Sequence, residues 1–135
     1  MSTSIEAIKI HDLRSGEVET NGTTILVDRM WPRGVAKADV DLDDRMPEVA
    51  PSPDLRTWFG HDPKRFEEFT SRYREELDER VGEDEEGEQL RELIKLAEQA
   101  TEKKPLALVY GAKDRQHNHA VVLRDWLRDE LKAGE

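Results

Sequence analysis

The sequence contains no cysteine, which excludes disulfide bonds, cysteine zinc ligands and a cysteine nucleophile. Its first residues lack a basic segment followed by an apolar core, so we expect no signal peptide. No apolar run approaches the roughly 20 residues that span a bilayer. These absences predict a soluble, cytoplasmic protein with no membrane partner. The length of 135 residues predicts a single domain, residues 1–135.

Several signatures of catalysis are absent as well. The sequence has no glycine-rich phosphate loop, no Rossmann glycine fingerprint and no Gly-x-Ser-x-Gly motif. Ordinary nucleotide-cofactor chemistry is therefore unsupported, and we predict no cofactor. Because a His-Glu-x-x-His motif is also missing, we predict no metal site.

The charge is strongly negative overall but unevenly distributed. A net charge of −10 disfavours nucleic acid and anionic membranes as partners. Residues 75–92 contain ten acidic and two basic residues, a composition typical of a solvated face, with an interaction surface as the alternative. Residues 29–37 instead contain three basic residues and no acid. A basic island on an acidic protein indicates a small anionic ligand. The pattern makes no prediction of oligomeric state.

Three short apolar runs predict strands, at residues 5–10, 24–28 and 106–110. The second and third are nearly continuous in apolar character, as in parallel strands that are buried on both faces. The first alternates and is predicted to be an edge strand. We therefore predict an α/β fold, with a small, mostly parallel three-stranded sheet flanked by helices in a Rossmann-like layered sandwich.

Four helices are predicted between and after these strands. One covers residues 53–58, and the next begins after Asp62, an N-cap that is followed by Pro63. A third helix follows near residue 90, and the last runs from about residue 115 to 131. Apolar residues at helical spacing define the inner faces, with Trp126 assigned to the core: Phe66, Phe69, Tyr73, Leu77, Leu90, Leu93, Ile94, Ala97, Ala120, Leu123, Leu127 and Leu131.

Polar sequence follows both central strands. Residues 28–34 follow the second strand, and the third strand ends at Tyr110 and continues into residues 111–119. If the two strands are parallel neighbours, both segments lie at the same carboxyl edge of the sheet. Ligands of open α/β sheets bind at that edge. The sequence therefore predicts a binding site there, with Tyr110 among its residues.

Two arginines and a tryptophan follow the second strand. Arg29 and Arg33 lie on a turn marked by proline and glycine, where two guanidinium groups would clamp an anion. The alternative is that one of them pairs with Asp28 or Asp114 and braces the turn. Trp31 is either an aromatic wall of the pocket or part of the core.

The candidates after the third strand are mainly titratable. His117 and His119 are two residues apart, so they cannot chelate one metal while both are helical. Either one would move a proton or bind an anion, or else lie solvated at a helix start. Asp114 is assigned to the N-cap of the last helix and is kept as a candidate catalytic residue. Lys113 would reach an anion or be solvated. His61 would complete the site or only mark a helix start.

Three blocks of this sequence resemble the YeaO-like family, a bacterial and archaeal domain of unknown function. They are the Val-Asp-Arg-Met-Trp-Pro-Arg-Gly block at residues 27–34, the Ala-Pro-Ser and Leu-Arg-Thr-Trp-Phe-Gly-His-Asp-Pro blocks within residues 50–63, and residues 113–123. The resemblance implies an α/β fold and a cytoplasmic protein, and no established activity. Longer relatives carry a cysteine at the position of Tyr110, so cysteine chemistry does not transfer. This chain departs from the shorter relatives at Gly111 and His119.

Two hypotheses follow for the function. The first is an enzyme that acts on a small phosphorylated or carboxylated substrate, held by Arg29 and Arg33 while His117 or His61 moves a proton. The alternative is a non-catalytic module that binds a metabolite or a protein through the same arginines. The sequence alone does not assign an enzyme activity.

Overall fold

The computed structural model describes residues 4–82 and 85–133. Its centre is a parallel sheet in the order β1-β4-β2-β3, formed by β1 (Ile5–Lys9), β4 (Leu106–Tyr110), β2 (Thr23–Leu26) and β3 (Asp44–Arg45). The predicted α/β class and the parallel pairing of the two central strands are confirmed. The edge position predicted for the first strand is confirmed too.

The predicted number of strands was wrong, because the sheet has four strands and not three. The additional strand, β3, is only two residues long, and both residues are charged and exposed. It therefore carries none of the apolar pattern that identifies a strand. The first strand also ends one residue earlier than predicted, since Ile10 begins a short helix, α1 (Ile10–Ser15), that the sequence did not predict.

The helices are α2 (Pro53–Phe59), α3 (Phe66–Arg80), α4 (Glu88–Gln99) and α5 (His119–Ala133), with short 3₁₀ turns at Lys37–Asp39, Pro47–Val49 and Pro63–Arg65. Ser52 caps α2 by accepting a hydrogen bond from the Leu55 backbone N–H. Asp62 is a cap, as predicted, but it caps the 3₁₀ turn Pro63–Arg65, and α3 itself begins only at Phe66. No helix among the described residues is long and apolar enough to cross a bilayer.

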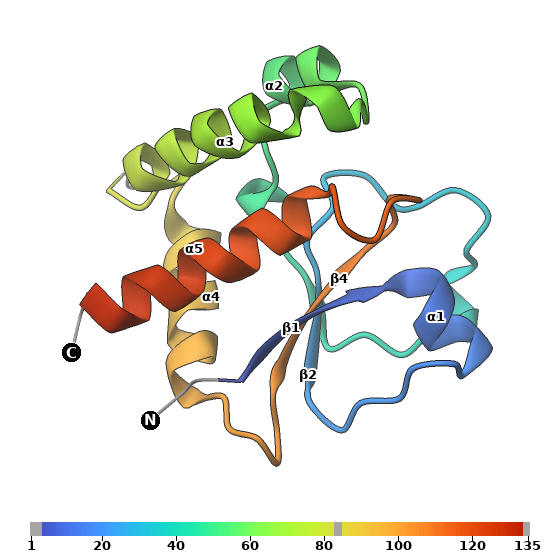
Figure 1. Ribbon diagram of the computed structural model, residues 1–135. Helices are drawn as coiled ribbons and strands as arrows, with labels where there is room; N and C mark the ends of the chain where they lie inside the picture. Colours follow the sequence, from blue (N-terminus) through green and yellow to red (C-terminus); the bar gives the residue numbers. More distant parts are fainter. Residues whose placement is uncertain (1–3, 83–84, 134–135) are drawn as a thin grey trace.

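Helices α4 and α5 cover one face of the sheet, and α1 lies on the other (Figure 1). The main core lies under the first face and includes Trp126, which is 1% exposed as the sequence predicted. Most of the predicted inner-face residues are buried there, while Phe66, Ile94 and Leu131 are only partly buried. A smaller core on the second face is formed mainly by α1 and the loop after β2.

Helices α2 and α3 lie beyond the carboxyl ends of the strands (Figure 1). The chain reaches them through the Pro47–Val49 turn, and α3 contacts both α2 and α5. The polar segments after β2 and β4 meet on the side of the strand ends that faces α2.

Candidate functional site

A cleft of about 960 Å³ opens at the carboxyl ends of β1, β4 and β2. Its walls come from the segments that follow these strands, from the Ala50-Pro51 segment, from α2 and from the start of α3. The cleft is in the size range of pockets that hold metabolites and other small molecules. The predicted meeting of the two polar segments at one sheet edge is confirmed.

Asp28 joins the two segments. Its Oδ2 accepts a hydrogen bond from the Gly111 backbone N–H at 2.9 Å. Its Oδ1 is buried, makes no hydrogen bond of good geometry among the described residues, and lies 3.2 Å from His119 Nε2. Because His119 Nε2 also lies 3.0 Å from the Val27 carbonyl oxygen, which can only accept, that hydrogen bond places a proton on Nε2. His119 thus ties the start of α5 to the end of β2.

Glycine at position 111 makes this junction possible. A Cβ atom there would lie 2.8 Å from two carbon atoms of Pro32 and 2.9 Å from Asp28 Oδ2. The absence of a side chain lets Pro32 lie directly against the end of β4. The loop after β2 is therefore fixed on the central strand of the site.

Arg29 forms no ion pair with an acid in residues 4–82 and 85–133. Its Nε and Nη2 atoms donate to the backbone carbonyls of Ala50 and Pro51, at 3.3 to 3.4 Å. Arg33 forms no ion pair or hydrogen bond with any other residue that the structure describes, and its side chain is exposed on the cleft. The alternative in which either arginine pairs with Asp28 or Asp114 is therefore wrong.

The backbone segment whose carbonyls accept hydrogen bonds from Arg29 is held in place by side chains of α3. The Tyr73 hydroxyl donates to the Val49 carbonyl at 2.6 Å, and burial raises the pKa of that hydroxyl, which keeps it a neutral donor. Arg80 Nη1 donates to the carbonyls of Glu48 and Ala50, each at 2.8 Å. Glu76 accepts hydrogen bonds from the backbone N–H and hydroxyl of Ser52. Residues 48–52, which we call the carbonyl segment, are thereby fixed against α3.

Six of the nine predicted site residues line the cleft, and three do not. The six are Arg29, Arg33, His61, Lys113, Asp114 and His119. Trp31 lies outside, with its Nε1 donating to the Val35 carbonyl at 2.5 Å and its ring against the smaller core. Tyr110 is 2% exposed within the main core, and burial raises the pKa of its hydroxyl. The His117 ring faces Asp114 and lies edge-on to Phe66, with the two ring centroids 5.1 Å apart.

The start of the last helix differs from the prediction. Helix α5 begins at His119, not near residue 115, and its N-cap is Asn118, whose Oδ1 accepts from the Val121 N–H at 3.0 Å. Asp114 is therefore not the cap of α5. It closes the preceding turn by accepting from the backbone N–H groups of Gln116 and His117, and its Oδ2 lies 2.8 Å from His117 Nδ1.

Sequence reasoning missed several residues that line the cleft, among them Lys9, His11, Arg56 and Asn118. Lys9 is the last residue of β1, and Arg56 lies in α2. His11 Nδ1 is buried and has no hydrogen-bond partner within the described ranges. The position of Lys9 at a strand end was a usable signal, since the same edge was already predicted to hold the site.

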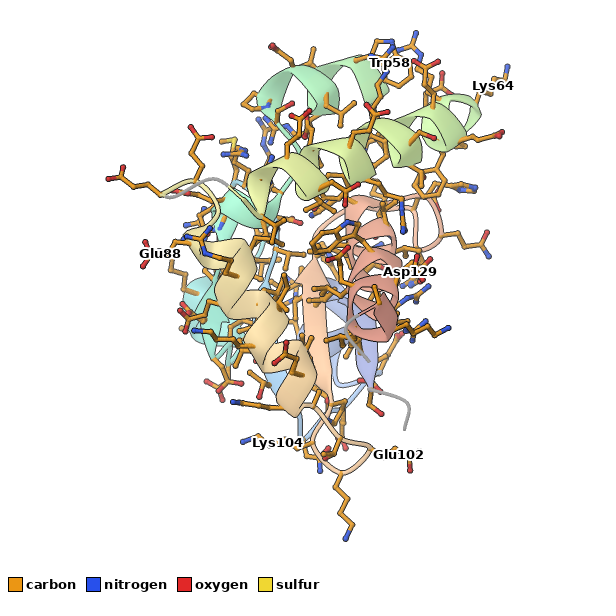
Figure 2. All side chains as sticks on the ribbon, turned by 90° about the vertical axis from the view of Figure 1, so that its left-hand side faces the viewer. Trp58, Lys64, Glu88, Glu102, Lys104 and Asp129 are labelled. Carbon is orange, nitrogen blue, oxygen red and sulfur yellow. The ribbon has the colours of Figure 1, made fainter. Side chains whose placement is uncertain are left out.

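The cleft carries an excess of positive charge. Five cations line it, namely Lys9, Arg29, Arg33, Arg56 and Lys113, against the two carboxylates of Asp28 and Asp114, so its formal charge is +3 with neutral histidines. None of the five forms an ion pair with an acid in residues 4–82 and 85–133. Elsewhere charged side chains such as Lys64 and Glu88 project outward into solvent (Figure 2), and Asp129 pairs with Arg74.

Asp114 provides a test of the turn before α5. Hydrogen bonds from the His117 and Gln116 backbone N–H groups, and then from the His117 side chain, hold the Asp114 pKa at about 2, below its ordinary value of 3.8. The stabilisation from the ionised carboxylate is therefore complete above pH 3.8 and lost as the pH falls toward 2. We expect the stability difference between the wild type and Asp114→Asn, measured by urea unfolding, to shrink across this interval. A difference that stays constant with pH would contradict the assigned hydrogen bonds.

The fold and the site together define a parallel α/β protein with a positively charged cleft at the strand ends. Comparison with known families identifies the family: the chain belongs to the one described as the inactive DUF488-N3 subclade, whose model matches residues 5–135. It is 40% identical to "Uncharacterized protein YeaO" of Escherichia coli (strain K12) over 110 residues, 82% of this chain and 87% of the relative. The resemblance to YeaO-like proteins is thereby confirmed.

Mycobacterial relatives match nearly the same part of the chain. "Uncharacterized protein Mb3100c" of Mycobacterium bovis and "Uncharacterized protein Rv3073c" of Mycobacterium tuberculosis are each 38% identical over 107 residues. The matches cover 79% of this chain and 81% of each relative. No solved structure gives a significant match.

Proposed function

We propose that the cleft binds a small anionic ligand and that the chain acts as a non-catalytic binding protein. The observation that carries this proposal is the group of five cleft cations, none of which has an acidic partner in the part of the chain that the structure describes. The chain has 31 acidic and 21 basic residues, so acidic partners are abundant. Gathering like charges in one cleft is unfavourable unless an anion compensates them, and guanidinium groups match phosphate and carboxylate oxygens well.

The histidines support binding without catalysis. His119 Nε2 is committed to the Val27 carbonyl, and His117 Nδ1 to Asp114. His117 does not line the cleft, so it is not placed to move a proton on a ligand bound there, which is the role that the enzyme hypothesis gives it. The description of the matching family as inactive points the same way.

His61 supports the second candidate, an enzyme on a small phosphorylated or carboxylated substrate. It lines the cleft, is exposed, and adopts a left-handed backbone conformation with φ of 57°, which is uncommon for a residue other than glycine. An imidazole held in this way, with no hydrogen bond or ion pair to another described residue, would serve as an acid or base. Turnover of a ligand by the wild type that is lost in His61→Ala would favour the enzyme.

The binding proposal predicts a thermal-shift result. At about 100 times its dissociation constant, a ligand stabilises the folded state by about 2.7 kcal/mol, which corresponds to a shift of several degrees in this size of domain. We expect such a shift from one or more members of a panel of phosphate, sulfate, carboxylates and nucleotides, and its loss in Arg33→Ala. Lys95→Ala is the control, because Lys95 is exposed on α4 and does not line the cleft.

Either of two outcomes would contradict the proposal. One is a panel in which no anion stabilises the wild type. The other is a shift that Arg33→Ala and Lys95→Ala retain equally, since binding would then not depend on the cleft.

A further inference from the structure

The five cleft cations fall into two groups by their place on the sheet. Arg29 and Arg33 follow β2, and Arg56 comes from α2, where its Nη2 lies 4.0 Å from the sulfur of Met30. These three form the arginine group. Lys9 ends β1 and Lys113 follows β4, and these two form the lysine group. Each group thus reaches the cleft from a different side of the sheet edge.

The lysine group is a linked pair. Lys9 Nζ donates a hydrogen bond to the backbone carbonyl of Lys113 at 3.0 Å. This contact joins the end of β1 to the loop after β4, and it uses one of the three N–H donors of the Lys9 ammonium. The Lys113 ammonium has no partner among the described residues and is exposed on the cleft.

The strand order separates the two groups. β4 lies between β1 and β2, with Lys9 beside Tyr110 and Leu26 beside Val109. Adjacent strands are about 4.8 Å apart, so the ends of β1 and β2 are roughly 10 Å apart. A single phosphate or carboxylate group is much smaller than this backbone span, whereas a ligand with two separated anionic groups would match it.

The surface between the two groups is partly apolar, although the Asp28 carboxylate also lies there, with its Oδ2 bound to the Gly111 N–H. Pro32 lies against the end of β4 at Gly111, and Ala112 lines the cleft beside it. A ligand that reached both groups would place an uncharged connecting part over these residues. The cleft of about 960 Å³ has room for such a molecule.

We propose, building on the proposed function, that the ligand is an organic molecule with two separate phosphate groups, one bound by the arginine group and the other by the lysine group. Two phosphates carry about −3 to −4 in charge at neutral pH, whereas two carboxylates carry −2. The former balances the formal charge of +3 on the cleft more fully.

The test uses a sugar monophosphate and the matching bisphosphate, fructose 6-phosphate and fructose 1,6-bisphosphate, with affinities measured by calorimetry. Two groups bound at once act as a bivalent ligand, so we expect the bisphosphate to bind the wild type at least about tenfold more tightly. Lys113→Ala removes this advantage, so the two sugar phosphates should bind this variant with affinities within about twofold of each other. Arg33→Ala weakens both ligands, and Lys95→Ala changes neither.

The outcomes separate this inference from the proposed function. Equal affinities for the two sugar phosphates, both reduced by Arg33→Ala, would overturn the two-phosphate inference and leave anion binding intact. A tenfold preference that survives in Lys113→Ala would also overturn it, because the lysine group would then play no part. Binding of no anion to the wild type would overturn both.

Discussion

Replacement of Arg80 by alanine is expected to lower the free energy of unfolding by about 2 to 4 kcal/mol, because it removes two charged hydrogen bonds from a nearly buried position. Only 12% of the Arg80 side chain is exposed, and its Nη1 donates to the carbonyls of Glu48 and Ala50. Without it, both carbonyls lose a donor, and Glu76 loses the cation that lies 3.6 Å from its Oε1.

The same variant is expected to weaken anion binding several-fold. The Ala50 carbonyl that accepts from Arg80 also accepts from Arg29, so the carbonyl segment couples α3 to the cleft. Urea unfolding and calorimetry with a ligand from the thermal-shift panel measure the two effects. Arg80→Lys is the matched control, since it keeps the charge and one donor, and its losses should be intermediate. Unchanged anion affinity in a folded Arg80→Ala variant would refute the coupling.

Replacement of Trp126 by alanine is expected to cost about 3 to 5 kcal/mol of stability, the range for deleting a large aromatic side chain from a core. Trp126 is 1% exposed, and its Nε1 donates to Asp78 Oδ1 at 2.9 Å, joining α5 to α3. Trp126→Phe keeps most of the apolar volume and loses this hydrogen bond, so we expect a smaller loss, of about 1 to 2 kcal/mol.

The Trp126 variants also separate stability from binding. Trp126 does not line the cleft, so anion affinity in Trp126→Phe should match the wild type at temperatures where both are folded. Chemical denaturation gives the stability change, and calorimetry below the unfolding transition gives the affinity. A folded Trp126→Phe that failed to bind would show that the cleft depends on the core beneath α5 more than the structure indicates.

The fold was largely predictable because its central strands and inner helix faces are apolar. β2 and β4 are buried on both faces, and continuous apolar runs are specific for such strands. β3 was not predictable, since Asp44 and Arg45 join the sheet only through backbone hydrogen bonds to β2. Such pairing depends on the path of the chain in three dimensions and requires no particular pattern of apolar and polar side chains.

The position of the site was predictable from the sequence, whereas the full set of residues that line it was not. Arg29, Arg33 and Lys113 were predicted because they follow strand ends, and the carboxyl ends of parallel strands bring residues that are distant in sequence to one edge of the sheet. Arg56 resembles any exposed helix residue in the sequence, and only the packing of α2 beyond the strand ends brings it to the cleft. The start of α5 was misplaced because Asp114 and Asn118 are both good caps, and the turn that Asp114 closes delays the helix.

The strand order has a consequence for how the chain acquires its structure during synthesis. β1 emerges first from the ribosome, yet its sheet partner is β4, in a register that joins residue 5 to residue 106. β4 also lies between β1 and β2 and pairs with both. Neither β1 nor β2 can therefore pair with its central neighbour until β4 has been synthesised. Pairings this remote in sequence form slowly because a long loop must close first. We therefore expect nascent chains that stop short of residue 106 to expose the apolar faces of β1 and β2 and to depend on chaperones.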